Sequence, residues 1–414
     1  MSGGSVATER AFIQVGVMFT AVILDRRAIT LRSVAIAALV VLFRRPETLM
    51  GPGFQMSFAA TAALVAVFNA LRGHPVMTGQ PLLIRGPVAL VISSAVAGAA
   101  TAPFSAGHFN LIAVYGLLAN LLTVPVMGSV VIPMAVVALV LWPFGLEAAA
   151  LWVMEHGLVW ILGVAGFVAD LPGATRPISA PPQGILGLIA FGGMMLILWR
   201  GRGRVLGVLP LLAALVLWSG ADRPDVLLSP NGRLAGALTA QGNRALSKYR
   251  GDGFVARTWL QNDGDSANQA TAAARAGWWP ETGGQVVTLA SGVTLWHGTG
   301  RGVAEHVAEA CARYDVVLTS ADIGPDVPEL GTARTWVLNL LRGAHGARLP
   351  PGPRRLVAPA PLSGAAGAAC LLIDSKVLAQ TGSLAFHQTH AGLTMTTARG
   401  VQGARLWTQT YRGQ

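Results

Sequence analysis

The sequence is poor in charged residues, and this shortage is uneven along the chain. Only 12% of the 414 residues are charged, about half of the ~25% that is usual in soluble domains. No lysine occurs among residues 1–219. Apolar residues make up 53% of the chain, and its mean hydropathy is +0.54. These values exclude a disordered chain, and they exclude an ordinary soluble enzyme along the whole length.

Several motifs of catalysis and metal binding are also absent. The sequence contains no Gly-x-Ser-x-Gly, no GxxxxGK[ST] phosphate loop and no Cys/His spacing typical of zinc. ATP-driven work by this chain alone is therefore not expected, and we predict no metal and no cofactor. The two cysteines are Cys311 and Cys370. They can pair if their part of the chain lies outside the cytoplasm, and two buried free thiols are the alternative.

Charge divides the chain into two halves. Residues 1–219 carry 12 arginines and 6 acidic residues, whereas residues 220–414 carry 18 basic and 13 acidic residues in a similar length. Because charge is costly in a bilayer, this contrast predicts a membrane domain over 1–219 and a water-compatible domain over 220–414. Such a chain is expected to be a multi-pass membrane protein.

Long apolar runs identify the candidate membrane segments of the first half. About 20 apolar residues are needed to cross the hydrocarbon core as a helix. The segment 111–142 contains Pro125 and Pro133, so whether it crosses once or twice stays open. We predict seven to nine membrane segments, some tilted, broken or re-entrant. The candidates are 11–24, 28–43, 54–71, 87–104, 111–142, 148–169, 185–199 and 205–219.

Arginines in short loops predict the orientation. Arg200, Arg202 and Arg204 form the densest cluster and lie between the last two segments. Since basic loops favour the cytoplasmic side, residues 220–414 are expected in the periplasm. Four further arginines could steer a polyanion, whereas topology determination and contact with lipid headgroups are the alternative. They are Arg26, Arg27, Arg44 and Arg45.

Polar residues at bilayer depth are the candidate functional residues, because they need a partner or a water-filled cavity. A proline inside a helix removes one backbone hydrogen bond and leaves a carbonyl without its donor. At bilayer depth, backbone that lacks helical hydrogen bonds is tolerated only where it is buried in protein or faces water. Residues 120–133 are therefore the predicted polar passage, with a structural kink satisfied by neighbouring helices as the alternative. The candidates for the passage are Gln55, Ser57, His108, Asn110, Asn120 and Pro125.

The second half has the pattern of an α/β domain. Alternating or continuous short apolar runs predict strands at 286–289, 293–297, 315–319, 336–340, 356–358, 370–373 and 384–387, and a helix at 302–313. His387 and His390 are a weak indication of a metal site, and structural or solvent-exposed histidines are the favoured alternative. The turn Asn262-Asp263-Gly264-Asp265 resembles the start of a Ca²⁺ loop but lacks the later glutamate.

Three stretches of the first half resemble the ComEC competence family. SGGSVATERA at 2–11 resembles its SG-x-S-x-x-T-x-RA segment. Arg45-Pro46 followed by GPGFQMSFAA at 51–60 is similar to the more specific P…PGFQ[LM]SFAA signature. APF at 102–104, HF at 108–109 and GLLANLLTVP at 116–125 resemble its P…HF…GLLANLL-x-[VI]P stretch. Together these motifs cover about residues 1–145.

The resemblance implies an inner-membrane channel protein that passes single-stranded DNA into the cytoplasm during natural transformation. Its implied partners are a DNA receptor outside, a helicase-like motor inside, the lipid bilayer, and either further copies of the chain or an amino-terminal partner fragment. The match begins partway into the family's membrane domain, so we expect this chain to be a carboxy-terminal part.

The resemblance also implies that residues 220–414 are a degenerate metallo-β-lactamase-like domain. The HxHxDH metal motif of that domain is missing from this sequence, so no nuclease activity and no zinc are transferred to it. The alternatives to a channel component are a membrane-tethered metal-dependent hydrolase or nuclease, and a truncated, non-functional remnant.

Overall fold

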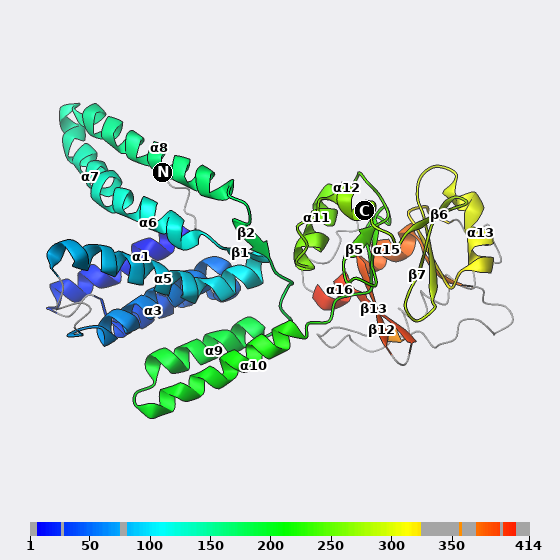
Figure 1. The fold of residues 1–414 in the computed structure, drawn as a ribbon, viewed down its shortest axis with the longest axis horizontal. Helices are drawn as coiled ribbons and strands as arrows, with labels where there is room; N and C mark the ends of the chain where they lie inside the picture. Colours follow the sequence, from blue (N-terminus) through cyan, green and yellow to red (C-terminus); the bar gives the residue numbers. More distant parts are fainter. Residues whose placement is uncertain are drawn as a thin grey trace. The chain divides into compact units, whose positions relative to one another are not determined.

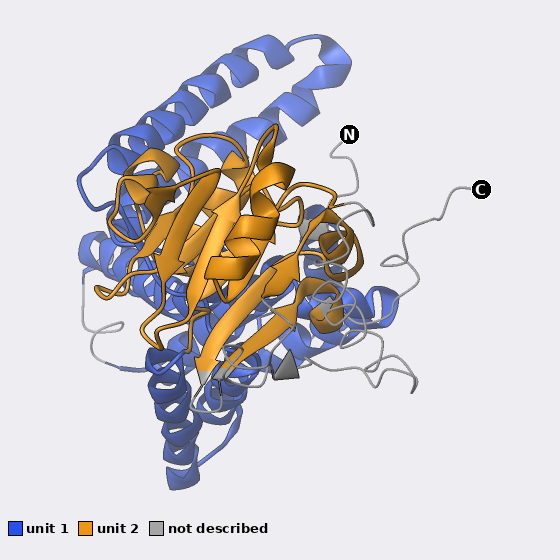
Figure 2. Ribbon diagram, turned by 90° about the vertical axis from the view of Figure 1, so that its right-hand side faces the viewer, with its two compact units in different colours: residues 1–221 blue, residues 222–414 orange. Residues whose placement is uncertain are grey.

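The computed structural model describes residues 6–25, 29–74, 81–323, 356–357, 370–389 and 392–402. The chain divides into two compact units, residues 1–221 and residues 222–414 (Figure 2). The first unit is helical and the second contains two β-sheets (Figure 1). This agrees with the predicted helical half followed by an α/β half.

The first unit is built from helices in chain order. They are α1 (Val6–Ile23), α2 (Leu31–Arg44), η1 (Pro46–Met50), α3 (Pro52–Ala70), α5 (Leu82–Phe109), α6 (Gly116–Val126), η2 (Met127–Val131), α7 (Ile132–Leu141), η3 (Trp142–Phe144), α8 (Glu147–Ala169), α9 (Ile185–Leu198), η4 (Arg202–Gly207) and α10 (Val208–Ser219). Local sequence sets several of their ends. A capping box of Thr30 and Ser33 begins α2, and Pro52 occupies the first turn of α3, where its missing N–H costs nothing.

Five helical runs in the described part are long and apolar enough to cross a membrane. They are Pro52–Ala70, Leu83–Phe109, Gly116–Phe144, Glu147–Ala169 and Arg202–Ser219, and Ile185–Leu198 is a shorter apolar helix. In the most apolar stretch of each run, at most 17% of the residues are buried. Such side chains need lipid as their solvent, so the protein is a membrane protein. The count of seven to nine segments stays a prediction.

The predicted segment 111–142 differs from the structure in two ways. Leu111–Ala113 is a strand, β1, which pairs in antiparallel fashion with β2 (Thr175–Pro177), so the helix begins only at Gly116. The two internal prolines do not unwind the helix. Instead, one π-helical turn, η2, follows Pro125, and the helical run continues to Phe144. A π turn absorbs the missing N–H of a proline by shifting the hydrogen-bond pattern.

The second unit has a six-stranded and a five-stranded sheet. The strands in chain order are β3 (Val226–Leu228), β4 (Ala235–Leu238), β5 (Arg244–Leu246), β6 (Trp279–Glu281), β7 (Gly284–Thr288), β8 (Thr294–Gly298), β9 (Val316–Thr319), β10 (Leu356–Val357), β11 (Leu371–Ile373), β12 (Leu384–Thr389) and β13 (Gly392–Thr397). The sheet orders are β10-β13-β12-β3-β4-β5, which is antiparallel, and β11-β9-β8-β7-β6, in which β11, β9 and β8 are parallel.

Alternation along the strands arranges the second unit in four layers. Val316 and Leu318 of β9 join the core between the two sheets, whereas Val317 packs beneath α13 (Val303–Arg313). On the other sheet, Val226 and Leu228 face the same inter-sheet core. Leu227 points to α11 (Gly253–Asn262) and α12 (Gln269–Ala273). Since successive strand residues point to opposite faces, the order is helix, sheet, sheet, helix. Two further helices are α15 (Ser375–Thr381) and α16 (Ala398–Gln402).

Most of the predicted elements of the second half are confirmed. The hairpin over 286–297 is β7 and β8, and Gly292 takes a φ of +85° in its turn. The predicted helix at 302–313 is α13, and the predicted strands at 315–319, 370–373 and 384–387 are β9, β11 and β12. The predicted strand at 356–358 is β10, whereas the one at 336–340 lies outside the described residues.

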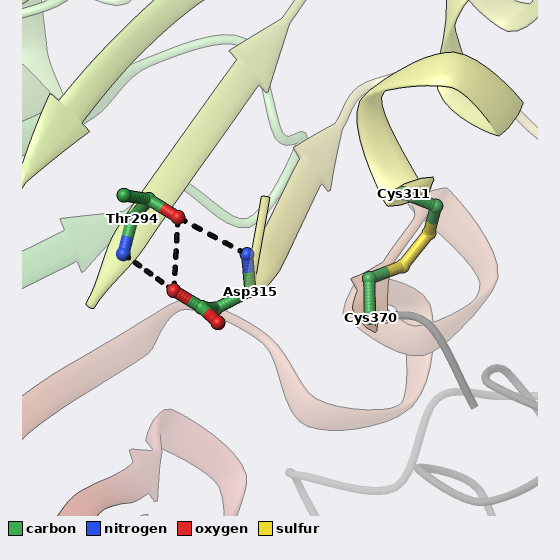
Figure 3. Close-up of a disulfide and its surroundings, with 4 residues drawn as sticks. All are labelled: Thr294, Cys311, Asp315 and Cys370. Atoms are coloured by element: carbon green, nitrogen blue, oxygen red, sulfur yellow. Dashed lines mark hydrogen bonds between the residues drawn. A yellow bond between two sulfur atoms is a disulfide. The ribbon is translucent and has the colours of Figure 1, made fainter. Parts of the chain in front are cut away.

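The two cysteines are joined in a disulfide. Cys311 lies on α13 and Cys370 immediately precedes β11, with their Cα atoms 5.0 Å apart (Figure 3). Nearby, the Asp315 carboxylate accepts hydrogen bonds from the backbone N–H and the hydroxyl of Thr294. The pairing left open by the sequence is therefore present, and it fastens α13 to the edge strand of the five-stranded sheet.

Candidate functional site

Two of the predicted passage residues contact each other across α3 and α5. The Nε2 atom of His108 lies 2.8 Å from Oε1 of Gln55, although 53 residues separate them. The side-chain amide of Gln55 donates to the Leu49 carbonyl at 3.0 Å. Because that bond fixes the amide orientation, the Gln55 oxygen faces the imidazole, and His108 donates through Nε2. The contact locks the start of α3 to the end of α5.

Asn110 ends α5 and turns the chain into β1. It has a left-handed φ of +57°, which asparagine tolerates better than most residues. Its side chain is buried, its amide lies 3.5 Å from the Ile178 carbonyl, and its own carbonyl accepts from the Ile178 N–H at 2.9 Å. This predicted passage residue therefore also shapes the backbone where β1 meets the segment after β2.

The other predicted passage residues lie on α3 and α6 and make no such contacts among the described residues. Ser57 and Asn120 are half-buried on α3 and α6, and Pro125 is exposed inside α6. Among the described residues, no hydrogen bond is made by the side chains of Ser57 or Asn120. The structure thus joins Gln55 to His108 and leaves Ser57 and Asn120 available to another ligand.

The carbonyls around Pro125 are satisfied from nearby side chains. The hydroxyl of Ser129 donates to the Pro125 carbonyl at 2.6 Å, and the indole of Trp160, on α8, donates to the Leu122 carbonyl at 3.1 Å. Gly157 of α8 lies so close to this turn that a Cβ there would come within 2.8 Å of Val131. These contacts favour the structural-kink alternative for residues 120–133 over unwound backbone.

Arg44 and Arg45 are bridged by one carboxylate. Their Nε atoms lie 3.1 and 3.2 Å from the two oxygens of Glu9, on α1. The Arg44 side chain stays 64% exposed, whereas that of Glu9 is only 22% exposed. The pair of cations therefore retains a net positive charge beside the start of α3. Arg26 and Arg27 lie outside the described residues.

Arg10 is a residue that sequence reasoning did not single out. Its Nη1 lies 3.1 Å from where a Cβ on Gly53 would stand, so the guanidinium rests on the first turn of α3 and would have to shift by a few tenths of an ångström for a larger residue. Its Nε and Nη1 atoms are buried without a partner in the described part of the chain. Arg10 falls within the family motif at 2–11 and Gly53 within that at 51–60. Their membership of these motifs was the signal in the sequence that could have pointed to their contact.

These contacts all gather at one end of the helical unit, which we call the motif end. It holds the starts of α1 and α3 and the ends of α2 and α5. The start of α9 also belongs to it, since Gly107 of α5 packs so closely on Leu186 that an added Cβ would lie 2.7 Å from that side chain. The end of α10 belongs to it as well, where the Trp218 indole donates to the Ser179 carbonyl at 2.8 Å. Arg200 and Arg202 precede α10 at the other end of the α9–α10 hairpin.

A cavity of about 490 Å³ lies beside the rest of α3. It is bordered by α1, α2, α3 and α5, and polar groups interrupt its largely apolar lining. Within it, the Gln14 amide lies 3.4 Å from the hydroxyl of Thr61. Its polar residues are Gln14, Ser33, Thr61, Asn69, Arg72 and Ser93. Helices that build the motif end thus also border an open pocket.

No cluster of metal-ligating side chains is found in the described part of the second unit. No group of three His, Cys, Asp or Glu side chains there could hold a metal ion. His387 lies on β12, whereas His390 is outside the described residues. The carboxylates of the candidate Ca²⁺ turn are taken by cations, since Asp263 pairs with Arg244 and Asp265 with Arg275.

Comparison with known proteins identifies the helical unit. Residues 1–203 match the family model described as Competence protein. This range contains the motif-end contacts made by Glu9, Arg10, Gln55 and His108. Comparison with characterised proteins and with solved structures gives no match. Through residues 1–203 the chain belongs to the competence protein family, and it is a ComEC-like protein with a role in DNA uptake.

Proposed function

We propose that the protein is a component of the channel that passes single-stranded DNA across the inner membrane during natural transformation. The observation that carries this proposal is the Gln55–His108 contact at the motif end. It joins two family motifs that are far apart in sequence, near nitrogens of Arg10 that are buried and have no partner among the described residues. Polar groups held together in this way at a helix end suit a charged polymer that enters between helices.

We assign each polar or charged group at the motif end a role in the entry of DNA between the helices. Arg44 and Arg45, only partly neutralised by Glu9, attract the phosphate backbone. The free nitrogens of Arg10 can donate to a phosphate, as arginine does with a fork geometry. Asn120 and Ser57 offer donors and acceptors without partners in the described structure, and the cavity beside α3 provides volume further along.

The proposed orientation has the motif end facing the periplasm. Two observations support it. Arg200, Arg202 and Arg204 precede α10 at the opposite end, where a cytoplasmic position satisfies the preference of basic loops. The Cys311–Cys370 disulfide of the second unit suits an oxidising compartment. DNA would then meet the motif end first, after delivery by a receptor outside, and a helicase-like motor would pull it from the cytoplasmic side.

We further propose that the second unit is a degenerate metallo-β-lactamase-like domain without nuclease activity. Its helix–sheet–sheet–helix layering supports this assignment, and the missing HxHxDH motif removes the ligands that would activate a water molecule. The assembled channel is proposed to contain further copies of this chain or an amino-terminal partner fragment.

Natural transformation of the host with chromosomal substitutions tests the channel. We expect His108→Leu and Gln55→Leu each to lower transformation by about tenfold or more, since ~1.4 kcal/mol on a barrier changes a rate tenfold. Membrane levels of the protein should stay normal. Ser129→Ala is the matched control, because its hydroxyl bonds only a carbonyl of its own helix. Unchanged transformation in both variants would refute the proposal.

A reporter fusion tests the orientation. Alkaline phosphatase fused after Gln414 should be active, because it folds only outside the cytoplasm. The same reporter placed between Arg200 and Arg204 should be inactive. The opposite pattern would reverse the assignment of the motif end to the periplasm.

A further inference from the structure

Large apolar side chains are rarely exposed on the second unit. Only four in its described part are exposed, namely Tyr249, Phe254, Trp279 and Val401. Two of them, Tyr249 (61% exposed) and Phe254 (83% exposed), lie five residues apart, where β5 leads into α11. Trp279 is a third exposed ring and lies elsewhere in the sequence, whereas Tyr249 and Phe254 are close along the chain; a cluster of exposed apolar groups marks an interaction site.

Cations neighbour the two rings along the chain. Arg250 and Arg257 are exposed between and beyond them. Lys248 lies near Asp252 and Arg233, and both charges affect its pKa. Burial lowers the pKa of Lys248, Asp252 raises it, and Arg233 lowers it. The Asp252 carboxylate also accepts from the Asn231 amide at 2.7 Å. Lys248 and Arg233 thus lie near a single carboxylate, Asp252, which already accepts a hydrogen bond.

The backbone beneath the rings is fixed. The Gln269 amide, at the start of α12, donates to the Lys248 and Gly251 carbonyls at 3.2 and 2.7 Å. Helix α11 buries Ala256, Trp259 and Leu260 in the domain. Phe254 and Arg257 are one turn apart and share its outward face. The surface is therefore presented in one conformation, with little ordering cost on binding.

We propose that this surface binds single-stranded DNA through stacking of bases on Tyr249 and Phe254 and contacts of the phosphates with the cations. We call it the stacking surface, and it comprises Arg233, Lys248, Tyr249, Arg250, Phe254 and Arg257. Aromatic rings interleaved with cations are the pattern of proteins that bind single strands without sequence preference. The inference rests on the proposed function in its choice of ligand, but it concerns a separate site.

A membrane surface is the competing ligand, and the geometry disfavours it. A helix that lies in a lipid interface exposes a continuous apolar face. Helix α11 instead turns its apolar face into the domain and exposes one ring, with a second ring on the preceding loop and Arg250 between them. Such spacing suits separate bases better than insertion into acyl chains.

The test uses the full chain in phosphatidylcholine nanodiscs with a short oligo-dT. Hydrogen exchange of residues 248–257 should slow when the oligonucleotide is added, and the titration of this protection gives a Kd for this site alone. We expect Tyr249→Ala and Phe254→Ala each to raise that Kd about tenfold. Arg257→Gln should reduce the slope of log Kd against log salt by about 0.7.

Matched controls define the outcomes. Phe254→Tyr keeps a ring and should bind normally, and Trp279→Ala removes an equally exposed ring elsewhere on the unit and should have no effect. His108→Leu should leave the protection intact while transformation falls, which separates this inference from the channel proposal. Absence of protection by DNA, an equal loss in Trp279→Ala, or protection produced by phosphatidylglycerol without DNA would each overturn it.

Discussion

The two units of the protein treat apolar side chains in opposite ways. Nearly all of the large exposed apolar residues in the described structure precede residue 220, whereas the second unit fully buries residues as large as Trp296 and Phe386. The helical unit can expose leucine and phenylalanine because lipid replaces water around it. The second unit must close two sheets over a common core.

This difference decides where polar contacts matter most. In the second unit a buried polar group is surrounded by protein and is costly unless it is paired, as Arg244 is. In the helical unit, packing between helices supplies most of the stability, and polar contacts add little to it. Under the proposed function Gln55 and His108 serve transport, while buried polar residues such as Arg244 in the second unit serve folding.

The largest effect is expected at the buried ion pair of the second unit. Arg244 is 0% exposed, pairs with Asp263, and donates to the carbonyls of Gly236 and Pro224 at 3.2 and 3.0 Å. Arg244→Met would leave the Asp263 carboxylate buried and unpaired, lowering the free energy of unfolding by about 3–5 kcal/mol. Hydrogen exchange of the strand β4 amides measures this change.

A second substitution separates pairing from packing. Arg244→Met combined with Asp263→Leu removes both charges, so it should lose clearly less stability than Arg244→Met alone. If the double variant were as unstable as the single one, hydrogen bonds to Gly236 and Pro224 rather than the ion pair would hold this corner of the six-stranded sheet.

The disulfide should be the next largest contributor. Cys311 and Cys370 are 59 residues apart, and removal of such a link typically costs about 2–4 kcal/mol by freeing the unfolded chain. Cys311→Ala with Cys370→Ala should therefore accelerate exchange in α13 and β11. Reductant should do the same to the unmodified protein and nothing to the variant. Exchange in α3 and α5 should not respond, because the chain has only these two cysteines.

His297 should make the second unit sensitive to acid. Burial lowers its pKa from 6.5 to about 4, and its Nε2 donates to the Gly232 carbonyl at 2.9 Å. Lys248 adds to the lowering, and that hydrogen bond opposes it. The unfolded chain therefore binds more protons between pH 6.5 and 4, so stability present above pH 6.5 is lost as the pH falls.

The size of this effect follows from the two pKa values. Between pH 7 and pH 5 the free energy of unfolding should drop by about 2 kcal/mol. His297→Gln keeps a neutral donor and should abolish most of that dependence, as measured by hydrogen exchange corrected for intrinsic rates. A pH dependence that survives His297→Gln would assign the acid sensitivity to other groups.

Sequence patterns predicted the elements of both units better than their contacts. The hairpin of β7 and β8 followed from alternating residues around Ser291-Gly292. Strands β4 and β5 were missed, because Ala235–Leu238 and Arg244–Leu246 contain no β-branched or aromatic residue and are strands only through their neighbours. Strand β1 was missed because its apolar residues continue the hydropathy of the next helix, whereas Asn110 ends α5 through its left-handed backbone.

The candidate site was predictable residue by residue but not as an arrangement. Gln55 and His108 each stand out as polar groups within apolar runs. Their contact depends on the packing of α3 against α5, which no local pattern encodes. The position of Arg10 on Gly53 depends likewise on α1 reaching the first turn of α3. Local sequence sets which groups are costly to bury, and tertiary packing decides which partners they find.

The smallest effect is expected at the Gln55–His108 contact, and it gives the sharpest test of the comparison. A double-mutant cycle with Gln55→Leu, His108→Leu and both together isolates their coupling in detergent-induced unfolding. Hydrogen bonds between membrane helices couple by about 0.6 kcal/mol, with a maximum near 1.7, because the unfolded state in the membrane also finds partners. A coupling of this size beside a large loss of transformation would show that the contact serves transport. A coupling as large as that expected for Arg244 and Asp263 would instead mean that both units are held together by their polar interiors.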